Sequence, residues 1–303
     1  MAGSRDYRGT MKSHFIDVGG PSHYLEFEGD GPPLVLVHGI GASYLSWQPV
    51  VELLAQSYRV LVPDLIGFGF TPPHGRKTTV RRNAEFLIDF VETLAADRVT
   101  LVGNSMGGLV SMLAAVERPG LVERIILVNP ALPVVSIRSI SRDSQRLVLP
   151  LLPMVGNTAA KYYYHERSPE EEVEDTLRLV LSRGAKIDPI YRAAAVEMAR
   201  ARREMEWNVD AFTDAARSIA VELRSRRKFH ELLHRISQPT LLMHGTEDRV
   251  VPADSARWAA QQRPDWAFRL LEGVGHTPQI EDPALFVALV EDWLDQPAHL
   301  THR

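Results

Sequence analysis

The segment Val102-Gly103-Asn104-Ser105-Met106-Gly107-Gly108 decides the fold of this chain. An apolar run at 99–102 leads into it and a helix-like run at 109–116 leads out of it. Its G-x-S-x-G pattern therefore predicts a sharp strand-to-helix turn with Ser105 at the apex, where the glycines remove side chains that would keep strand and helix apart. The amide groups and dipole at the start of the helix would stabilise negative charge beside the serine. The alternative is a glycine-rich turn with an ordinary serine.

The composition is that of an ordinary globular protein of 303 residues, long enough for one large core with an insertion. With 34 basic and 38 acidic side chains the formal net charge is −4, which does not favour binding to nucleic acid or to an anionic membrane. The chain contains no cysteine, which excludes disulfides, thiol nucleophiles and cysteine metal sites.

The sequence predicts neither a secretory signal nor a membrane span. Residues 1–10 are polar and lack the apolar core of a signal peptide. The longest apolar stretch, 147–155, is too short to cross a bilayer and is interrupted by Pro150 and Pro153. We therefore expect the protein to be cytoplasmic.

Apolar runs and helix-like segments alternate along most of the chain. This rhythm predicts an α/β protein with a mostly parallel sheet and right-handed crossovers, preceded by an antiparallel pair of strands. The expected strands are 13–18, 24–28, 34–37, 58–62, 99–102, 125–128, 240–243 and 267–271. The expected helices of this part are 47–55, 80–94, 105–116, 253–262 and 283–294.

Between 131 and 235 the rhythm changes to helix-like segments without a convincing buried strand, most clearly at 170–181 and 189–205. We therefore expect a core domain formed by 1–130 and 236–303, with a helical cap at 131–235 over the carboxyl edge of the sheet. The stretches 147–154 and 162–164 would either line a pocket beneath this cap or form the cap's own core.

Three side chains suited to nucleophilic catalysis follow different strands. A serine needs a base to remove its proton, a histidine titrates near neutrality, and a carboxylate orients that histidine. Ser105, Asp248 and His276 each lie at a strand end, and such loops gather at one edge of a doubly wound sheet. Glu247 is the rival of Asp248, but the pattern Gly245-x-x-Asp248 favours the aspartate. We expect the rate to fall in mild acid as His276 becomes protonated.

The loop after the strand at 34–37 reads His38-Gly39-Ile40-Gly41. Its small residues allow the backbone to approach Ser105, so we expect the amide groups of Ile40 and Met106 to form an oxyanion hole. Gly39, Gly41 and Asn104 are then expected to line the substrate site. The stretch 63–69 is expected to shape a loop.

Together these motifs resemble the α/β-hydrolase fold family, in its capped branch. The resemblance covers residues 14–130 and 236–295, and it rests on His38-Gly39, Asp64-x-x-Gly67-x-Gly69, Gly103-x-Ser105-x-Gly107, Gly245-x-x-Asp248 and Gly275-His276. It implies an α/β-hydrolase fold with a mostly parallel eight-stranded sheet flanked by helices and a helical cap inserted after the sixth strand. It also implies hydrolysis through an acyl-enzyme without a cofactor.

The resemblance also narrows the reaction. Ser105 differs from the aspartate that haloalkane dehalogenases and epoxide hydrolases use at this position. The stretch 104–108 is similar to carbon–carbon hydrolases of aromatic ring cleavage. Those enzymes usually have a glycine–proline-rich oxyanion loop and a tryptophan after the histidine, whereas this chain has Gly39-Ile40-Gly41-Ala42-Ser43 and Thr277. We therefore favour a serine carboxylesterase for short to medium acyl chains, with a carbon–carbon hydrolase of the meta-cleavage-product type as the alternative.

Two readings from other classes remain. His230-Glu231-Leu232-Leu233-His234 fits the H-E-x-x-H signature of zinc peptidases, with both imidazoles on one helix face. Its cationic flank and the helix-ending Pro239 favour a chance match, so we expect no metal. A non-catalytic ligand binder on the same scaffold is the other reading. The expected partner is a small-molecule ester, and the sequence leaves the oligomeric state open.

Overall fold

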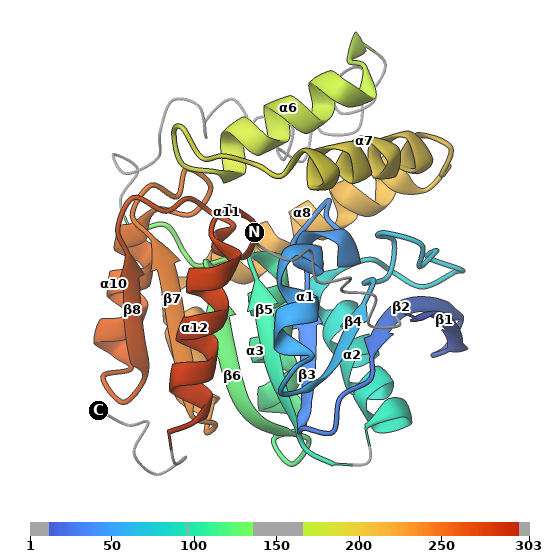
Figure 1. Ribbon diagram of the computed structural model, residues 1–303. Helices are drawn as coiled ribbons and strands as arrows, with labels where there is room; N and C mark the ends of the chain where they lie inside the picture. Colours follow the sequence, from blue (N-terminus) through green and yellow to red (C-terminus); the bar gives the residue numbers. More distant parts are fainter. Residues whose placement is uncertain (1–11, 96, 136–165, 297–303) are drawn as a thin grey trace, which may run out of the picture.

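The computed structural model describes residues 12–95, 97–135 and 166–296. The predicted pocket segments at 147–154 and 162–164 lie outside these residues. In the described part, eight strands form one twisted sheet in the order β1-β2-β4-β3-β5-β6-β7-β8 (Figure 1). The first two are antiparallel to their neighbours and the others run parallel. The strands are β1 Lys12–Asp17, β2 Pro21–Phe27, β3 Pro33–Val37, β4 Arg59–Pro63, β5 Val99–Asn104, β6 Val122–Val128, β7 Thr240–Gly245 and β8 Ala267–Leu271.

Helices cover both faces of this sheet, and alternate residues of the strands feed two apolar cores. Val35 and Val37 of β3 pack toward α2 (Val80–Leu94) and α3 (Met106–Glu117), while Leu34 and Leu36 pack toward α1 (Gln48–Leu54) and α12 (Pro283–Leu294). Helix α10 (Ala253–Gln262) joins the first core. Burial on both faces explains why these strands are continuous apolar runs, as expected for parallel strands. The α/β-hydrolase fold expected from the sequence is confirmed by this arrangement.

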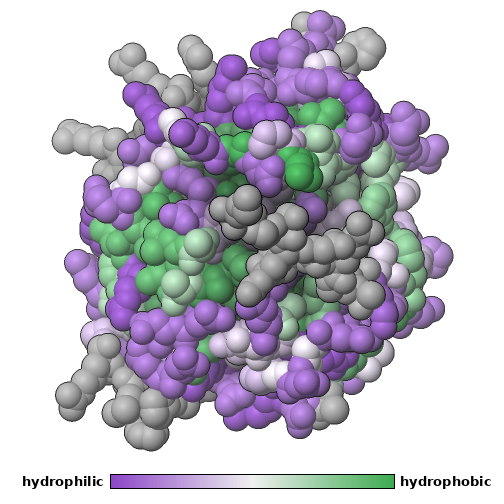
Figure 2. Space-filling model, viewed as in Figure 1, coloured by the Kyte–Doolittle hydropathy of each residue, from purple (hydrophilic) through white to green (hydrophobic). Residues whose placement is uncertain are grey.

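Four described helices lie between β6 and β7 in the chain, and α6 and α7 pass over the carboxyl edge of the sheet (Figure 1). The four helices are α6 Pro169–Val180, α7 Pro189–Arg203, α8 Asn208–Leu223 and α9 Arg226–Arg235. Ser168 and Glu171 form a capping box at the start of α6, and Val173, Leu177 and Ala199 pack α6 against α7. Hydrophilic side chains cover the upper edge of the molecule, over α6 (Figure 2). The division into a core and a 131–235 cap stays a prediction.

Some element boundaries differ from those expected. The helix predicted at 47–55 is a short 3₁₀ turn at Tyr44–Trp47 followed by α1, which starts at Gln48 with a proline in its first turn. The helix predicted at 105–116 begins at Met106, because Ser105 has a positive φ and non-helical backbone angles. Both α8 and α9 lie outside the two segments that were clearest in the sequence.

Candidate active site

Ser105 lies at the apex of the turn that joins β5 to α3. Its φ of 56° and ψ of −119° are unusual for a non-glycine residue, and its amide donates to the carbonyl of Val128 over 3.1 Å. The turn is tight: a Cβ atom at Gly107 would lie 2.1 Å from the carbonyl oxygen of Val37, and one at Gly103 would lie 2.5 Å from that of Gly107. Both positions therefore require glycine, and the serine is held in a strained, fixed conformation.

Asp248 and His276 are joined by a hydrogen bond of 2.7 Å between Oδ2 and Nδ1. The side chain of Asp248 is fully buried, and its carboxylate also accepts from the side chain of Asn129 and from the amides of Val250 and Val251. Burial alone would raise the pKa of Asp248, but the nearby His276, His244 and Asn129 together lower it. The carboxylate therefore stays charged, and it directs the other ring nitrogen of His276 away from itself.

The backbone of His276 is fixed from two sides. Its amide donates to the carbonyl of Val180, at the end of α6, over 2.6 Å. Its carbonyl accepts from the side-chain amide of Asn104 over 3.1 Å. Because Asn104 immediately precedes Ser105, this contact brings the histidine loop against the serine turn. Ser105 and His276 are both buried, with 7% and 3% of their surface exposed.

Glu281 links the same loop to the residues that follow α6. Its carboxylate accepts from the amides of Gly275 and Ser182 over 3.1 and 2.9 Å, and from the hydroxyl of Ser182. A Cβ atom at Gly275 would lie 2.6 Å from the backbone of Leu181, so only glycine allows this approach. On the acid loop, Arg249 donates to the carbonyl of Leu181 over 2.8 Å. The end of α6 is thus bonded to the loops that carry both Asp248 and His276.

The loop after β3 lies on the other side of Ser105. A Cβ atom at Gly39 would lie 3.1 Å from that of Ser105, so the backbone passes directly over the serine. Gly41 has a φ of 66° and faces the ring of Phe212 on α8, while its carbonyl accepts from Arg202 on α7. The structure therefore brings Gly39 to Ser105 and sets the neighbouring Gly41 against α7 and α8.

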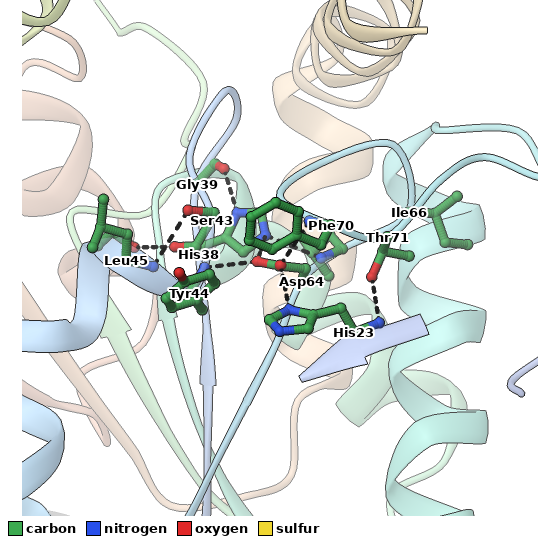
Figure 3. Close-up of polar contacts among 12 residues, drawn as sticks. His23, His38, Gly39, Ser43, Tyr44, Leu45, Asp64, Ile66, Phe70 and Thr71 are labelled. Atoms are coloured by element: carbon green, nitrogen blue, oxygen red, sulfur yellow. Dashed lines mark hydrogen bonds and ion pairs between the residues drawn. The ribbon is translucent and has the colours of Figure 1, made fainter. Parts of the chain in front are cut away.

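A buried network around Asp64 fixes this loop (Figure 3). The Asp64 carboxylate accepts from the amide of Tyr44 over 2.7 Å, from the amide of Phe70 over 2.9 Å and from His23 Nδ1 over 2.7 Å. His38 donates from Nδ1 to the carbonyl of Gly39 and accepts from the amide of Leu65 at Nε2. The stretch 63–69 was expected to shape a loop, and through Asp64 it ties the loops after β3 and β4 together.

His38 is fully buried beside this network. Burial lowers its pKa, although Asp64 and the Gly39 carbonyl favour the charged form. A neutral imidazole matches the two hydrogen bonds, because Nε2 must keep a lone pair to accept from Leu65. His38 is thus a neutral anchor of the loop.

Asp64 also belongs to a second Ser–His–Asp series. The hydroxyl of Ser13 lies 2.9 Å from His23 Nε2, and His23 Nδ1 lies 2.7 Å from Asp64. Ser13, however, lies within the edge strand β1, whereas Ser105 lies at the start of a helix. Amides at a helix N-terminus stabilise an oxyanion, and Ser13 has no such position. The two series therefore differ in the amide groups that would stabilise the oxyanion during acyl transfer.

Sequence reasoning missed Asn129, Glu281 and the carbonyl of Val180 as supports of the site, and it expected the stretch 63–69 to shape a loop without naming the partners of Asp64. Asn129 carried a signal, because it directly follows the strand beside the one that leads to Asp248. Its φ of 45° turns the side chain toward the carboxylate. Glu247, the rival acid, instead accepts from the exposed amide of Arg183.

The H-E-x-x-H helix lies elsewhere. His230 and His234 are on α9, which packs against α3 and α10. Among the described residues, no group of three or more histidine, cysteine or acidic side chains is arranged to hold a metal ion.

Comparisons with known proteins agree with the fold. A sequence model of the alpha/beta hydrolase fold family matches residues 32–283, which is most of the chain. The chain belongs to the α/β-hydrolase fold family. Hydrolysis is the chemistry that this membership supports. Among the helices that the structure describes, none is long and apolar enough to cross a membrane.

Three relatives illustrate the range of reactions on this α/β-hydrolase fold. The 2-hydroxy-6-oxo-2,4-heptadienoate hydrolase of Pseudomonas putida is 32% identical over 283 residues, which cover 91% of this chain and 94% of the relative. The crystal structure of a serine hydrolase involved in carbazole degradation matches with a TM-score of 0.72 and 26% identity, covering 94% of this chain and 99% of that one. The pimeloyl-[acyl-carrier protein] methyl ester esterase of Legionella pneumophila is 23% identical, covering 89% and 98%.

Proposed function

We propose that this α/β hydrolase is a serine carboxylesterase acting on esters with short to medium acyl chains. The observation that carries the proposal is the buried Asp248–His276 hydrogen bond, in a loop that Asn104 ties to the turn of Ser105. In this proposal Ser105 is the nucleophile, His276 is the general base and acid, and Asp248 holds His276 in the tautomer with the hydrogen on Nδ1.

Acylation follows from these roles. The Ser105 oxygen attacks the ester carbonyl and forms a C–O bond, while its proton passes to His276 Nε2. The resulting imidazolium is stabilised by the charged carboxylate of Asp248. The bond to the alcohol oxygen then breaks, and His276 gives its proton to the leaving alcohol. Water repeats the sequence in the second half-reaction and releases the acid.

The oxyanion is assigned to the amides of Ile40 and Met106. Two features support this: the approach of Gly39 to Ser105 and the position of Met106 at the first turn of α3. Each such donor stabilises the transition state by about 3 kcal/mol. Gly39, Gly41 and Asn104 would line the site, although the Asn104 amide already donates to Val128 and His276.

An ester needs only this machinery, because its leaving group is an oxygen that the His276 imidazolium protonates directly. A carbon leaving group needs in addition an electron-accepting substrate and a proton delivered to carbon. Carbon–carbon hydrolysis is nevertheless the second candidate, since the Pseudomonas putida relative is named for a dienoate substrate.

Turnover of p-nitrophenyl esters tests the proposal. We expect Ser105→Ala to lower kcat by about 10⁴-fold or more, with unchanged folding by circular dichroism. Ser13→Ala is the matched control, because it removes the serine of the second Ser–His–Asp series and should leave the rate unchanged. Equal rates for wild type and Ser105→Ala would remove Ser105 from the mechanism.

Substrate panels separate the two candidates. Esters of graded chain length and a vinylogous diketone are offered to the same enzyme preparation. Faster turnover of the diketone than of every ester, lost in Ser105→Ala, would replace the esterase by the carbon–carbon hydrolase.

A further inference from the structure

Two histidines on α9 present their ring nitrogens to each other. His230 and His234 lie one turn apart, and their Nε2 atoms are 3.0 Å from each other, with ring centroids 4.3 Å apart. Phe229 and Leu233, on another face of α9, are buried against the core, whereas His234 is exposed and His230 is half-buried. The pair is therefore accessible to solvent and carried by a well-anchored helix.

The two nitrogens share a hydrogen bond in this structure, and their separation is also that of two nitrogens bound to one metal ion, which would replace the hydrogen bond. Metal–imidazole bonds are about 2.05 Å long, so two nitrogens 3.0 Å apart subtend about 94° at a shared ion. This value is close to the right angle between neighbouring ligands in tetragonal Cu(II) or Ni(II) complexes. It is smaller than the roughly 109° of tetrahedral zinc. The geometry therefore favours copper and nickel over zinc.

The charges around the pair are mixed. Arg227, three residues before His230, is 3.5 Å from Glu231, and the guanidinium of Arg226 lies over the ring of Trp258 at 5.5 Å. His234 is in the last turn of α9, where the partial negative charge of the helix C-terminus favours a cation. These interactions offset part of the repulsion expected from the basic flank.

We propose that His230 and His234 form a two-ligand site for a late divalent transition metal, with the preference Cu(II) over Ni(II) over Zn(II). Solvent supplies the remaining ligands, because the described residues hold no third protein ligand there. The site is distinct from a zinc peptidase centre, which needs a third protein ligand. It is also independent of Ser105 and of the esterase proposal.

Metal binding to the intact protein tests this site. Titration of wild type with Cu(II) alone, followed by calorimetry, should show one binding site. Cu(II) should also raise the Tm, because it binds the folded state. Because the second ligand binds intramolecularly, His230→Ala or His234→Ala should weaken Cu(II) binding by at least about tenfold. Parallel titrations with each metal should give the tightest binding for Cu(II), weaker binding for Ni(II) and the weakest for Zn(II).

The controls address other histidines and folding. The double variant His299→Ala/His302→Ala removes two histidines near the C-terminus and should keep the wild-type affinity. Ester turnover should be the same in all of these variants, which shows that they are folded. Unchanged Cu(II) affinity in both His230→Ala and His234→Ala, or loss of binding only in the C-terminal double variant, would overturn the proposal. So would tighter binding of Zn(II) than of Cu(II).

Discussion

At the scale of single residues, Gly107 shows how closely strand and helix approach each other. We predict that Gly107→Ala destabilises the protein by about 3 kcal/mol, since its methyl group would meet the carbonyl of Val37 and neither backbone can retreat. Ester turnover should fall as well, because Ser105 would be displaced. Urea unfolding measures the first effect and steady-state kinetics the second.

Gly120 provides the control for this substitution. A Cβ atom there meets nothing within 4 Å, so Gly120→Ala should change stability by less than about 0.5 kcal/mol. A Gly107→Ala protein as stable as Gly120→Ala would show that the turn can relax.

The nucleophile turn and the acid–histidine pair were predictable because their residue types stand at strand ends in a fixed order. Asn129 and Asp64 were harder to predict. Both act through side-chain hydrogen bonds to other parts of the chain: Asn129 bonds Asp248, 119 residues away, and Asp64 bonds Tyr44 and His23 as well as the nearby Phe70. A pattern of neighbours in sequence does not contain such a partner.

At the scale of elements, α6 and the histidine loop behave as one bonded unit through Glu281. We predict that Glu281→Ala lowers kcat by about ten- to a hundredfold, since the backbone of His276 loses part of its support and small displacements of catalytic groups are costly. Glu281→Gln should retain most of the rate, because its oxygen still accepts from both amides and its NH₂ group donates to Ser182.

Kinetics at saturating and limiting ester concentration test this coupling. The exposed Glu272→Ala is the control for losing a nearby carboxylate. A positioning role would be contradicted if the loss of kcat in Glu281→Ala were no larger than the fraction of that variant that is unfolded. An equal loss of kcat in Glu281→Gln would contradict it as well.

Most strands were predictable as elements, because parallel strands buried on both faces are short apolar runs between turn residues. The helices at 166–235 were harder to predict. Helices α8 and α9 were not among the clearest segments, and α9 packs against α3 rather than against α6. On the side of α6, the contacts with the histidine loop use the carbonyl of Val180 and the amide of Ser182, and such backbone groups leave no signal in the sequence.

At the scale of the whole molecule, two buried neutral histidines set the response to acid. Burial lowers the pKa of both His38 and His244. In the unfolded chain a histidine titrates at about 6.5, so the unfolded state binds more protons below that pH. The free energy of unfolding should therefore be highest above pH 6.5 and decrease as the pH falls toward the folded-state values.

Urea titrations at pH 7.5, 6.5 and 5.5 measure this dependence. His244→Gln should show a shallower loss of stability on acidification than wild type, since one of the two buried imidazoles no longer titrates. The lowered pKa of Asp248 adds a further loss only below about pH 4, where unfolded carboxylates take up protons. Parallel curves for wild type and His244→Gln between pH 7.5 and 5.5 would refute the assignment.

The hydrogen bond from the His276 amide to the Val180 carbonyl bears on attempts to retarget this enzyme. Exchanging the segment between β6 and β7 among homologues is a natural route to new substrate specificity, with junctions chosen where the chain enters and leaves that segment. Here the stretch 178–183 must be kept native or co-selected with residues 247–249 and 275–281. A chimaera that replaces it would carry an intact nucleophile, acid and base, and would still turn over slowly.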